Sequence, residues 1–586
     1  MHTSTKLVAI ACALGAAALS GCYPSEMAPN WPVTQTQQSF DEMDAANRRQ
    51  APPVASAVTG ERIARARSEP HNWLTYYGAY DGQRFSQLDQ INAGNVAQLK
   101  TAWVFQAAPI GLLANPPSFS LEAAPIVVDG IMYLSGWDGY VWALDAATGD
   151  ELWRYRHAIP LDLPLCCGNV NRGVAVARGK VFYSSPNGHL VALDAVTGRP
   201  VWSKVWLDPR AGESSTMAPL IVRNMVIVGS SGAEYGVRGH IDAFDVDSGR
   251  RIWRRYPVPK PGEPGSETWP ANSSWERGGG SAWITGSFDP QLNLLYWGTS
   301  NPSPDFDGSM RRGDNLFTDS LLALDPDTGA IRWHYQFTPH DVWDYSGVNE
   351  NILFDEGGRQ LLAHFDRNGY LFILDRRTGQ RVSVSQFGDR VTWGRIDPAT
   401  GRVSDRREPT REGIEICPGP AGSKEWNHAS YSRTTGLLYA PVIDACATFR
   451  TFPTPFKEGL SYYGGEALVS PAQVRGGGVK AYRTNGQLAW QWRYKYPIVA
   501  SILSTAGDVL FVGTPDGFFI ALDARSGREL WRFRTGTGIH SNPVTYSVAG
   551  KQYVAVPTGW GGWIKGFAPN LFGHERGSAL FVFALP

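Results

Sequence analysis

Seven segments of the chain share one pattern of apolar and polar positions. Apolar residues lead to an Asp, a Thr-Gly or Ser-Gly pair follows, and a second apolar run usually ends on Trp: WALDAATGDELW (142–153), VALDAVTGRPVW (191–202), DAFDVDSGRRIW (242–253), LALDPDTGAIRW (322–333), FILDRRTGQRVS (372–383), VKAYRTNGQLAW (479–490) and IALDARSGRELW (520–531). Two apolar runs around a Gly-containing turn predict a pair of antiparallel strands. Strand pairs that recur every 40–50 residues or so are typical of a β-propeller.

The two ends of the chain each carry half of this pattern. SALFVFALP (578–586) matches the first half, and NVAQLKTAWVF (95–105) matches the second half. We therefore predict an all-β, eight-bladed β-propeller over residues 67–586, with a last blade closed by N- and C-terminal strands that leaves no open sheet edge. The intervals from Asp245 to Asp325 and from Asp375 to Tyr482 are longer than the others and leave room for insertions.

The tryptophans that close the repeats are expected to be structural. Each should dock between neighbouring blades, with its indole N–H donating to the next blade; they are Trp153, Trp202, Trp253, Trp333, Trp490 and Trp531.

The N-terminus reads as an export signal. One Lys precedes an apolar stretch from Leu7 to Leu19, which is too short for an ordinary membrane-spanning helix. The following Ser-Gly-Cys resembles a bacterial lipoprotein signal over residues 1–22 and predicts lipidation of Cys22; a plain secretory signal is the alternative. Residues 23–66 are rich in Pro, Ala, Ser, Gln and Asn and predict a flexible tether. These features predict that the protein lies on the periplasmic side of a bacterial cell envelope, anchored to a membrane by a lipid.

The charge balance and the cysteine content exclude some classes of function. Lys plus Arg and Asp plus Glu both number 54, and no basic run occurs, so nucleic-acid binding is not expected. No C-x-x-C-H motif is present, so no covalent haem is expected. Export favours disulfides among the four cysteines outside the signal, and the spacing alone leaves all three pairings open: Cys166, Cys167, Cys417 and Cys446.

Several motifs together carry a family resemblance. In order along the chain they are HNWLTYYGAYDGQRFSQLDQINAGNVAQLKTAW, CCGNVNRG, GGGSAW and YVAVPTGWGGW. The chain resembles the quinoprotein alcohol dehydrogenases, which are eight-bladed propellers that use pyrroloquinoline quinone (PQQ) with a metal ion. The resemblance implies that a vicinal Cys166–Cys167 disulfide covers one face of PQQ and that Trp283 covers the other. It leaves Cys417 and Cys446 as the second pair.

Further cofactor contacts follow from the same resemblance. PQQ carries three carboxylates, which guanidinium and backbone N–H groups suit. Arg367 matches the family Arg that contacts the quinone oxygens. The other matching rim positions are Glu122, Arg172, Thr216, Ser231, Gly232, Ala233, Asn427 and Trp563.

The expected metal site comes from three separate motifs. Glu234, Asn301 and Asp344 form a hard-oxygen set that suits Ca²⁺, and the lack of His and Cys ligands argues against Zn²⁺. Lanthanide-using relatives carry an extra Asp two residues after the catalytic Asp, where this chain has Ser346, which also favours calcium. Asp344 is the expected general base, and Asp341 is a weaker alternative.

Departures from the family pattern bear on the substrate. Asp305 and Val499 stand where methanol-specific relatives have bulky aromatics, which predicts a wider pocket and an alcohol larger than methanol; Asp305 could also favour a polar or cationic substrate. Electrons would pass to a separate acceptor such as cytochrome c. Two alternative functions compete with that of a quinoprotein alcohol dehydrogenase. A non-catalytic propeller lipoprotein acting as an envelope assembly scaffold has no reason to keep these motifs, and soluble sugar quinoproteins lack the CC-x-x-x-N-R-G segment.

Overall fold

The computed structural model describes residues 50–107, 120–160, 162–562 and 577–586, in which strands dominate and the only α-helix is α2 (Gly60–Ala64). The short 3₁₀ helices of these residues are η1 (Pro53–Ala57), η2 (Ala66–Ser68), η3 (Val96–Gln98), η4 (Trp137–Gly139), η5 (Pro209–Ala211), η6 (Ala233–Tyr235), η7 (Ser266–Thr268), η8 (Ser273–Arg277) and η9 (Pro471–Gln473). No helix of the described residues is long and apolar enough to cross a bilayer.

Five sheets follow one another along the chain, and each is built from four consecutive antiparallel strands. They are β3 (Ile126–Val128), β4 (Ile131–Ser135), β5 (Tyr140–Asp145) and β6 (Glu151–Arg156); β7 (Ala175–Ala177), β8 (Lys180–Ser184), β9 (His189–Asp194) and β10 (Pro200–Val205); β11 (Leu220–Val222), β12 (Met225–Gly229), β13 (Ile241–Asp245) and β14 (Arg251–Arg255); β15 (Ser287–Asp289), β16 (Leu294–Gly298), β17 (Ser320–Leu324) and β18 (Ile331–Gln336); β19 (Ile352–Glu356), β20 (Arg359–Phe365), β21 (Tyr370–Asp375) and β22 (Arg381–Gln386).

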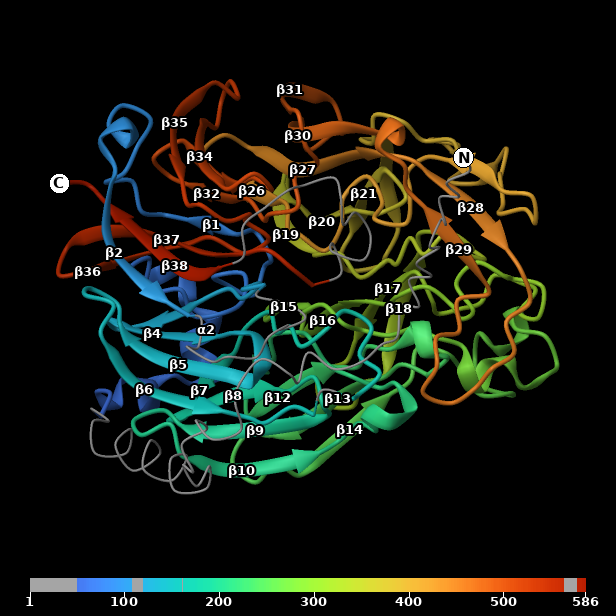
Figure 1. Cartoon of the computed structure of the whole chain (residues 1–586), viewed down its shortest axis with the longest axis horizontal. Helices are drawn as coiled ribbons and strands as arrows, with labels where there is room; N and C mark the ends of the chain where they lie inside the picture. Colours follow the sequence, from blue (N-terminus) through green and yellow to red (C-terminus); the bar gives the residue numbers. More distant parts are fainter. Residues whose placement is uncertain (1–49, 108–119, 161, 563–576) are drawn as a thin grey trace, which may run out of the picture. The chain divides into compact units, whose positions relative to one another are not determined.

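Three further sheets continue the series. They are β26 (Ser430–Ser432), β27 (Leu437–Ala445), β30 (Val474–Arg483) and β31 (Leu488–Tyr494); β32 (Leu503–Thr505), β33 (Val509–Gly513), β34 (Phe518–Asp523) and β35 (Glu529–Arg534), joined by β1 (Phe85–Ser86); and β36 (Val544–Val548), β37 (Lys551–Gly559), β38 (Ser578–Ala584) and β2 (Lys100–Gln106). In the last sheet β2 pairs antiparallel with β38, and Figure 1 shows these blue and red strands side by side. The two ends of the described chain thus complete one sheet, as the half-patterns predicted.

The long interval before Tyr482 holds additional structure. Two small sheets lie between β22 and β30, one of β23 (Arg395–Ile396) with β24 (Val403–Ser404), and one of β25 (Ile414–Ile416), β28 (Ala447–Thr451) and β29 (Gly465–Leu468). The expected insertion is therefore a folded β segment.

The repeated Asp makes the turn between the third and fourth strands. The Asp145 carboxylate accepts the backbone N–H groups of Ala147 and Thr148 at 2.8 and 3.0 Å, which is an Asx turn. Gly198 occupies the corresponding turn of the next sheet at φ +70°, and a Cβ there would stand 2.6 Å from the Trp153 ring. The Gly is required both by the backbone conformation and by the tryptophan that packs on it.

Four of the repeat tryptophans donate to the sheet that follows theirs. The indole N–H groups bond to backbone carbonyls: Trp153 to Ala195 at 3.0 Å, Trp202 to Val246 at 3.3 Å, Trp253 to Pro326 at 2.9 Å and Trp490 to Ala524 at 3.1 Å. Trp333 differs, because its indole nitrogen has no hydrogen-bond partner among the described residues. The carbonyl of Arg376, at the equivalent place in the next sheet, accepts the Tyr296 hydroxyl at 2.7 Å.

The expected tether over 23–66 is wrong for its last part. Residues 23–49 lie outside the described residues, but Ala51 and Val58 are buried in the main core cluster. The N–H of Ala51 donates to Val196 O, and Val58 O accepts from Arg178 N at 2.8 Å. The small residues that suggested a linker instead fit closely against β7–β10.

Candidate active site

A cavity of about 440 Å³ gathers residues from distant parts of the sequence. Its lining is Cys166, Cys167, Arg172, Thr216, Ser231, Glu234, Trp283, Phe306, Asp344, Ser346, Arg367, Pro420, Ala421, Glu425, Tyr463, Gly465, Glu466 and Ala467. Sequence motifs had predicted ten of these residues, from Cys166 to Arg367. They had not predicted Phe306, Pro420, Ala421, Glu425 or the residues of segment 463–467.

Two flat or compact apolar groups face this cavity. Cys166 and Cys167, between β6 and β7, form a disulfide with each other, and Trp283, between β14 and β15, lines the same space. The guanidinium of Arg172 lies 5.2 Å from the Trp283 ring centre and 4.5 Å from that of Trp426. Cation–π contacts of this kind hold the Arg172 side chain in place.

Arg172 also joins a buried polar group beside the cavity. It donates to Thr216 Oγ1 at 2.5 Å and pairs with Glu122 Oε2 at 3.1 Å. Burial raises the pKa of Glu122 to about 7, while the charge of Arg172 opposes this shift. Nε of Arg172 has no hydrogen-bond partner among the described residues, so one donor is left for a ligand.

The segment after β12 presents Glu234 to the cavity. Gly232 has φ +117°, in the left-handed region, and η6 begins at the next residue, Ala233. Ser231 and Glu234 line the cavity, and Ser231 Oγ and Glu234 Oε2 have no partner within the described chain. Burial raises the pKa of Glu234, and the charge of Arg367 lowers it.

Asn301 lies behind the cavity wall. It is buried at 1% exposure, and its Oδ1 accepts the Ser346 hydroxyl at 2.9 Å. Ser346 itself lines the cavity. An amide oxygen has two lone pairs, so Asn301 Oδ1 keeps one acceptor site for a cation.

Asp344 and Asp341 have different surroundings. Asp344 lines the cavity, has a left-handed φ of +62°, and lies 3.7 Å from Arg367 Nη1. Burial raises its pKa well above the usual value, and the charge of Arg367 opposes this. Asp341 is fully buried, and its two oxygens accept the N–H groups of Trp343 and Tyr345, both at 2.8 Å. Asp341 therefore shapes the loop that presents Asp344.

The guanidinium of Arg367 contacts two acidic side chains and one backbone carbonyl. Besides Asp344 it lies 3.7 Å from Glu425 Oε1, and it donates to the backbone oxygen of Pro420. Its Nε has no partner among the described residues. The guanidinium is thus fixed with a free donor near Asp344.

Some expected residues are buried next to the cavity or cannot be placed. Glu122, Gly232, Ala233, Asn301 and Asn427 are absent from the lining. Asn427 is nonetheless buried with neither amide atom hydrogen-bonded in the part of the chain described here. Trp563 lies outside the described residues.

The two residues expected to line the substrate pocket, Asp305 and Val499, are absent from the lining of this cavity. Asp305 is fully buried, and its neighbour Phe306 forms the wall instead. Val499, at 1% exposure, packs in a cluster with Ala421 and Trp560. An aromatic side chain is therefore present at this wall, contributed by the next residue along the chain. Tyr463 adds a second aromatic that no motif had indicated.

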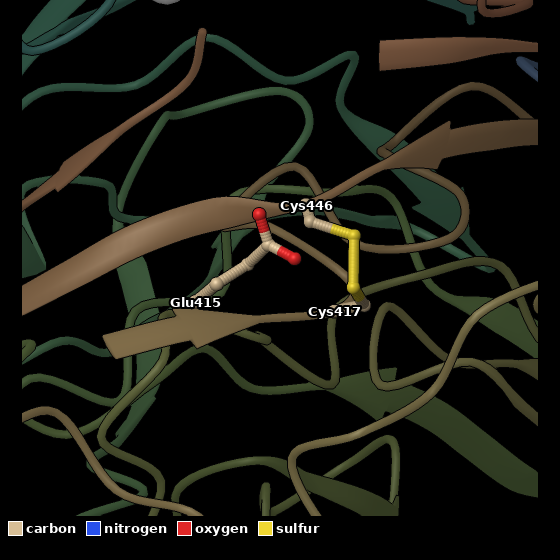
Figure 2. Close-up of side chains that lie close together, drawn as sticks. All are labelled: Glu415, Cys417 and Cys446. Atoms are coloured by element: carbon tan, nitrogen blue, oxygen red, sulfur yellow. A yellow bond between two sulfur atoms is a disulfide. The ribbon is translucent and has the colours of Figure 1, made fainter. Parts of the chain in front are cut away.

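The second disulfide is structural. Cys417 and Cys446 are bonded with a Cα–Cα distance of 4.3 Å, and Figure 2 shows Glu415 beside them. These three residues lie close enough together to hold a metal ion, but sulfur atoms in a disulfide are not thiolate ligands. The bridge instead ties β25 to β28.

Several known proteins share the sequence and the fold of this chain. Residues 73–385 and 473–554 match the family described as "Glucose/ethanol/alcohol dehydrogenase, beta-propeller domain" of PQQ proteins. The chain is 35% identical to quinoprotein alcohol dehydrogenase PedH of Pseudomonas putida, over 91% of this chain and 94% of that protein. It is 36% identical to a lanthanide-dependent methanol dehydrogenase of Methylorubrum extorquens, over 91% and 97%. A europium-containing methanol dehydrogenase structure superposes with a TM-score of 0.84 at 34% identity, covering 90% of this chain and all of that one.

Proposed function

Because the chain belongs to the PQQ-dependent alcohol dehydrogenase family, we propose that it oxidises an alcohol in the cavity described above. One observation carries this proposal: the vicinal disulfide, Trp283, Glu234 and Asp344 share a single cavity. A flat redox cofactor needs the first two, and cation binding and proton transfer need the acids.

The protein offers a fit for PQQ. Nε of Arg172, Nε of Arg367, Ser231 Oγ and the Asn427 amide are buried without hydrogen-bond partners in the described residues. Buried polar groups are rarely left unsatisfied, so these donors favour a polar, anionic ligand. The Cys166–Cys167 bridge and the Trp283 ring would cover its two faces.

The metal would be held by Glu234, Asn301 and Asp344. Their oxygens suit a hard cation, and we propose calcium because Ser346 stands where an extra Asp favours a lanthanide. When bound, PQQ and its metal ion supply a hydride acceptor and a Lewis acid.

Asp344 would act as the general base. It lines the cavity, whereas both oxygens of Asp341 are occupied by backbone N–H groups. Asp344 would take the hydroxyl proton of the alcohol as the α-hydride leaves. Arg367, 3.7 Å away, opposes the rise in the pKa of Asp344 that burial causes.

Three further proposals concern the protein's surroundings and architecture. Electrons leave for a separate acceptor such as cytochrome c.

Cys22, outside the described residues, carries a lipid that anchors the chain on the periplasmic side of a membrane. The eight larger sheets are the blades of one closed ring, and the tryptophan hydrogen bonds between successive sheets support this arrangement.

Dye-linked turnover tests the function. Purified apoprotein should oxidise alcohols only when PQQ and Ca²⁺ are both supplied, across a panel from methanol to aromatic alcohols. Absence of turnover under all combinations would contradict the proposal and favour the scaffold alternative.

Metal choice is tested separately. Wild type should be activated by Ca²⁺ and poorly by La³⁺, and Ser346→Asp should shift activation toward La³⁺ because the added carboxylate offsets the extra charge. A wild type that needs La³⁺ would refute calcium as the catalytic ion.

A further inference from the structure

Asp344 stands between two fully buried aromatic residues. Trp343 and Tyr345 are both 0% exposed, whereas Asp344 lines the cavity. Asp344 has a left-handed φ of +62°, a conformation that a residue other than glycine keeps only where its surroundings hold it. The contacts that fix Trp343 and Tyr345 therefore also fix the position of Asp344.

Both aromatic rings pack on Trp393, which lies in the folded insertion between β22 and β30. The ring centre of Trp393 is 4.9 Å from that of Trp343 and 5.6 Å from that of Tyr345, and Trp393 is itself 0% exposed. The rings of Trp343 and Tyr345 stack on each other, with centres 5.6 Å apart and an angle of 16° between their planes. The three side chains thus form one packed aromatic cluster.

Trp393 also contacts the second loop of the site. Its indole N–H donates to the backbone oxygen of Asn368 at 2.8 Å, and Asn368 directly follows Arg367. Nη1 of Arg367 lies 3.7 Å from Oδ1 of Asp344. One side chain therefore touches both of the loops that meet at this pair.

Hydrogen bonds to backbone oxygens fix the orientation of the cluster. The indole N–H of Trp343 donates to Arg407 O at 2.8 Å, and the backbone N–H of Arg407 donates to Trp393 O at 2.7 Å. The Tyr345 hydroxyl donates to Pro418 O at 2.9 Å. Each polar group on these rings has a partner, so the rings are held in orientation as well as in place.

We infer that Trp393 is a positioning residue for the Asp344–Arg367 pair, because it holds the loop of each. This inference rests on the proposed function, in which Asp344 is the general base. Trp393 is not among the described residues that line the cavity, so it acts through the two loops and not by touching the substrate. A misplacement of about 1 Å can cost roughly 10²-fold in rate, so even slight loosening of these loops should be visible in kcat.

The alternative is that Trp393 only stabilises the fold, as the repeat tryptophans do. Trp490 is a matched control, because its indole N–H also donates to a backbone oxygen, that of Ala524 at 3.1 Å. Trp490 lies on β31, and no strand residue of that sheet is among the described residues that line the cavity. Removing the indole N–H of Trp490 should therefore affect stability alone.

The first test requires neither cofactor nor turnover. Hydrogen exchange of the full-length protein is measured by mass spectrometry in the peptide that spans residues 341–346. Trp393→Phe keeps an aromatic ring and removes the indole N–H, so exchange of this peptide should become roughly fivefold faster, as for the loss of one buried hydrogen bond. Trp490→Phe should leave this peptide unchanged. Unchanged exchange in Trp393→Phe, or equal acceleration in both variants, would overturn the inference.

Turnover tests the consequence for catalysis. With PQQ and Ca²⁺ saturating, Trp393→Phe should lower kcat about tenfold or more and change KM by no more than about twofold, because the cavity wall is the same. Trp490→Phe should keep the wild-type kcat even if its melting temperature falls. Faster exchange with an unchanged kcat would overturn the role of Trp393 in catalysis. An inactive wild type would overturn the proposed function, whereas the exchange data separately decide whether Trp393 holds the loop.

Discussion

Two groups of residues line the same cavity and differ in how they are built. The motif group, with Cys166, Cys167, Trp283 and Asp344 among its members, lies in segments with recognisable sequence patterns. The insertion group comprises Phe306, Pro420, Ala421 and the segment 463–467, which lie in the two long intervals between repeats. We therefore predict that the motif group carries the chemistry and that the insertion group controls which alcohols fit.

The largest expected effect comes from the motif group. Asp344→Asn removes the proposed base but keeps an oxygen ligand, so kcat should fall roughly 10²-fold or more while PQQ still binds. Asp341→Asn should instead lower thermal stability, because it disturbs acceptors of two backbone N–H groups. Near-normal turnover of Asp344→Asn would move the base elsewhere.

The two disulfides allow a direct comparison between the groups. Cys417 and Cys446 are 29 residues apart, so replacing both with Ala should cost about 3.6 kcal/mol in the chain-entropy model. Replacing Cys166 and Cys167 with Ala closes no loop and should leave stability nearly unchanged while weakening PQQ binding. Denaturant unfolding and cofactor titration measure the two effects. Equal losses of stability in both double variants would contradict the distinction.

The insertion group should control substrate size. Phe306→Ala should raise kcat/KM for cyclic or aromatic alcohols relative to ethanol, by roughly tenfold, because it widens the wall. Val499→Trp should overpack the cluster around Ala421 and lower stability by about 1–3 kcal/mol, with similar losses for small and large alcohols. Selective exclusion of large alcohols by Val499→Trp would instead place Val499 in the pocket.

A smaller effect concerns Glu122 and pH. Its pKa is about 7 in the fold against 4.5 normally, so folding favours the protonated form. This contribution is present below about pH 4.5 and is lost as pH rises towards 7. Unfolding of the apoprotein should therefore show a declining stability of at most about 1.4 kcal/mol per pH unit in that window. Glu122→Gln should flatten the slope, and an unchanged slope would show that Glu122 stays ionised.

The residues of the motif group could be predicted from the sequence because each lies in a short, recognisable motif. The CC pair, GGGSAW and the Asp344 segment could each be read without knowing their neighbours. It missed Phe306 by one position, because alternation within an irregular loop does not show which residue faces the cavity. Tyr463 carried no signal at all, since a Tyr in a long interval has many possible environments.

The sequence by itself determined the repeating sheets, the closure of one sheet by both ends, and the residue types needed for a PQQ site. Asx turns and their glycines act over a few residues, and the tryptophans recur at a fixed place in the repeats, so these patterns can be recognised in the sequence alone. Only the tertiary structure decided that Asp341 accepts backbone N–H groups of its own loop, that residues 51–66 pack on the core, and that Asp305 is buried away from the cavity lining. Those outcomes depend on contacts between segments far apart in the chain, where burial and the nearest charges determine what each carboxylate does.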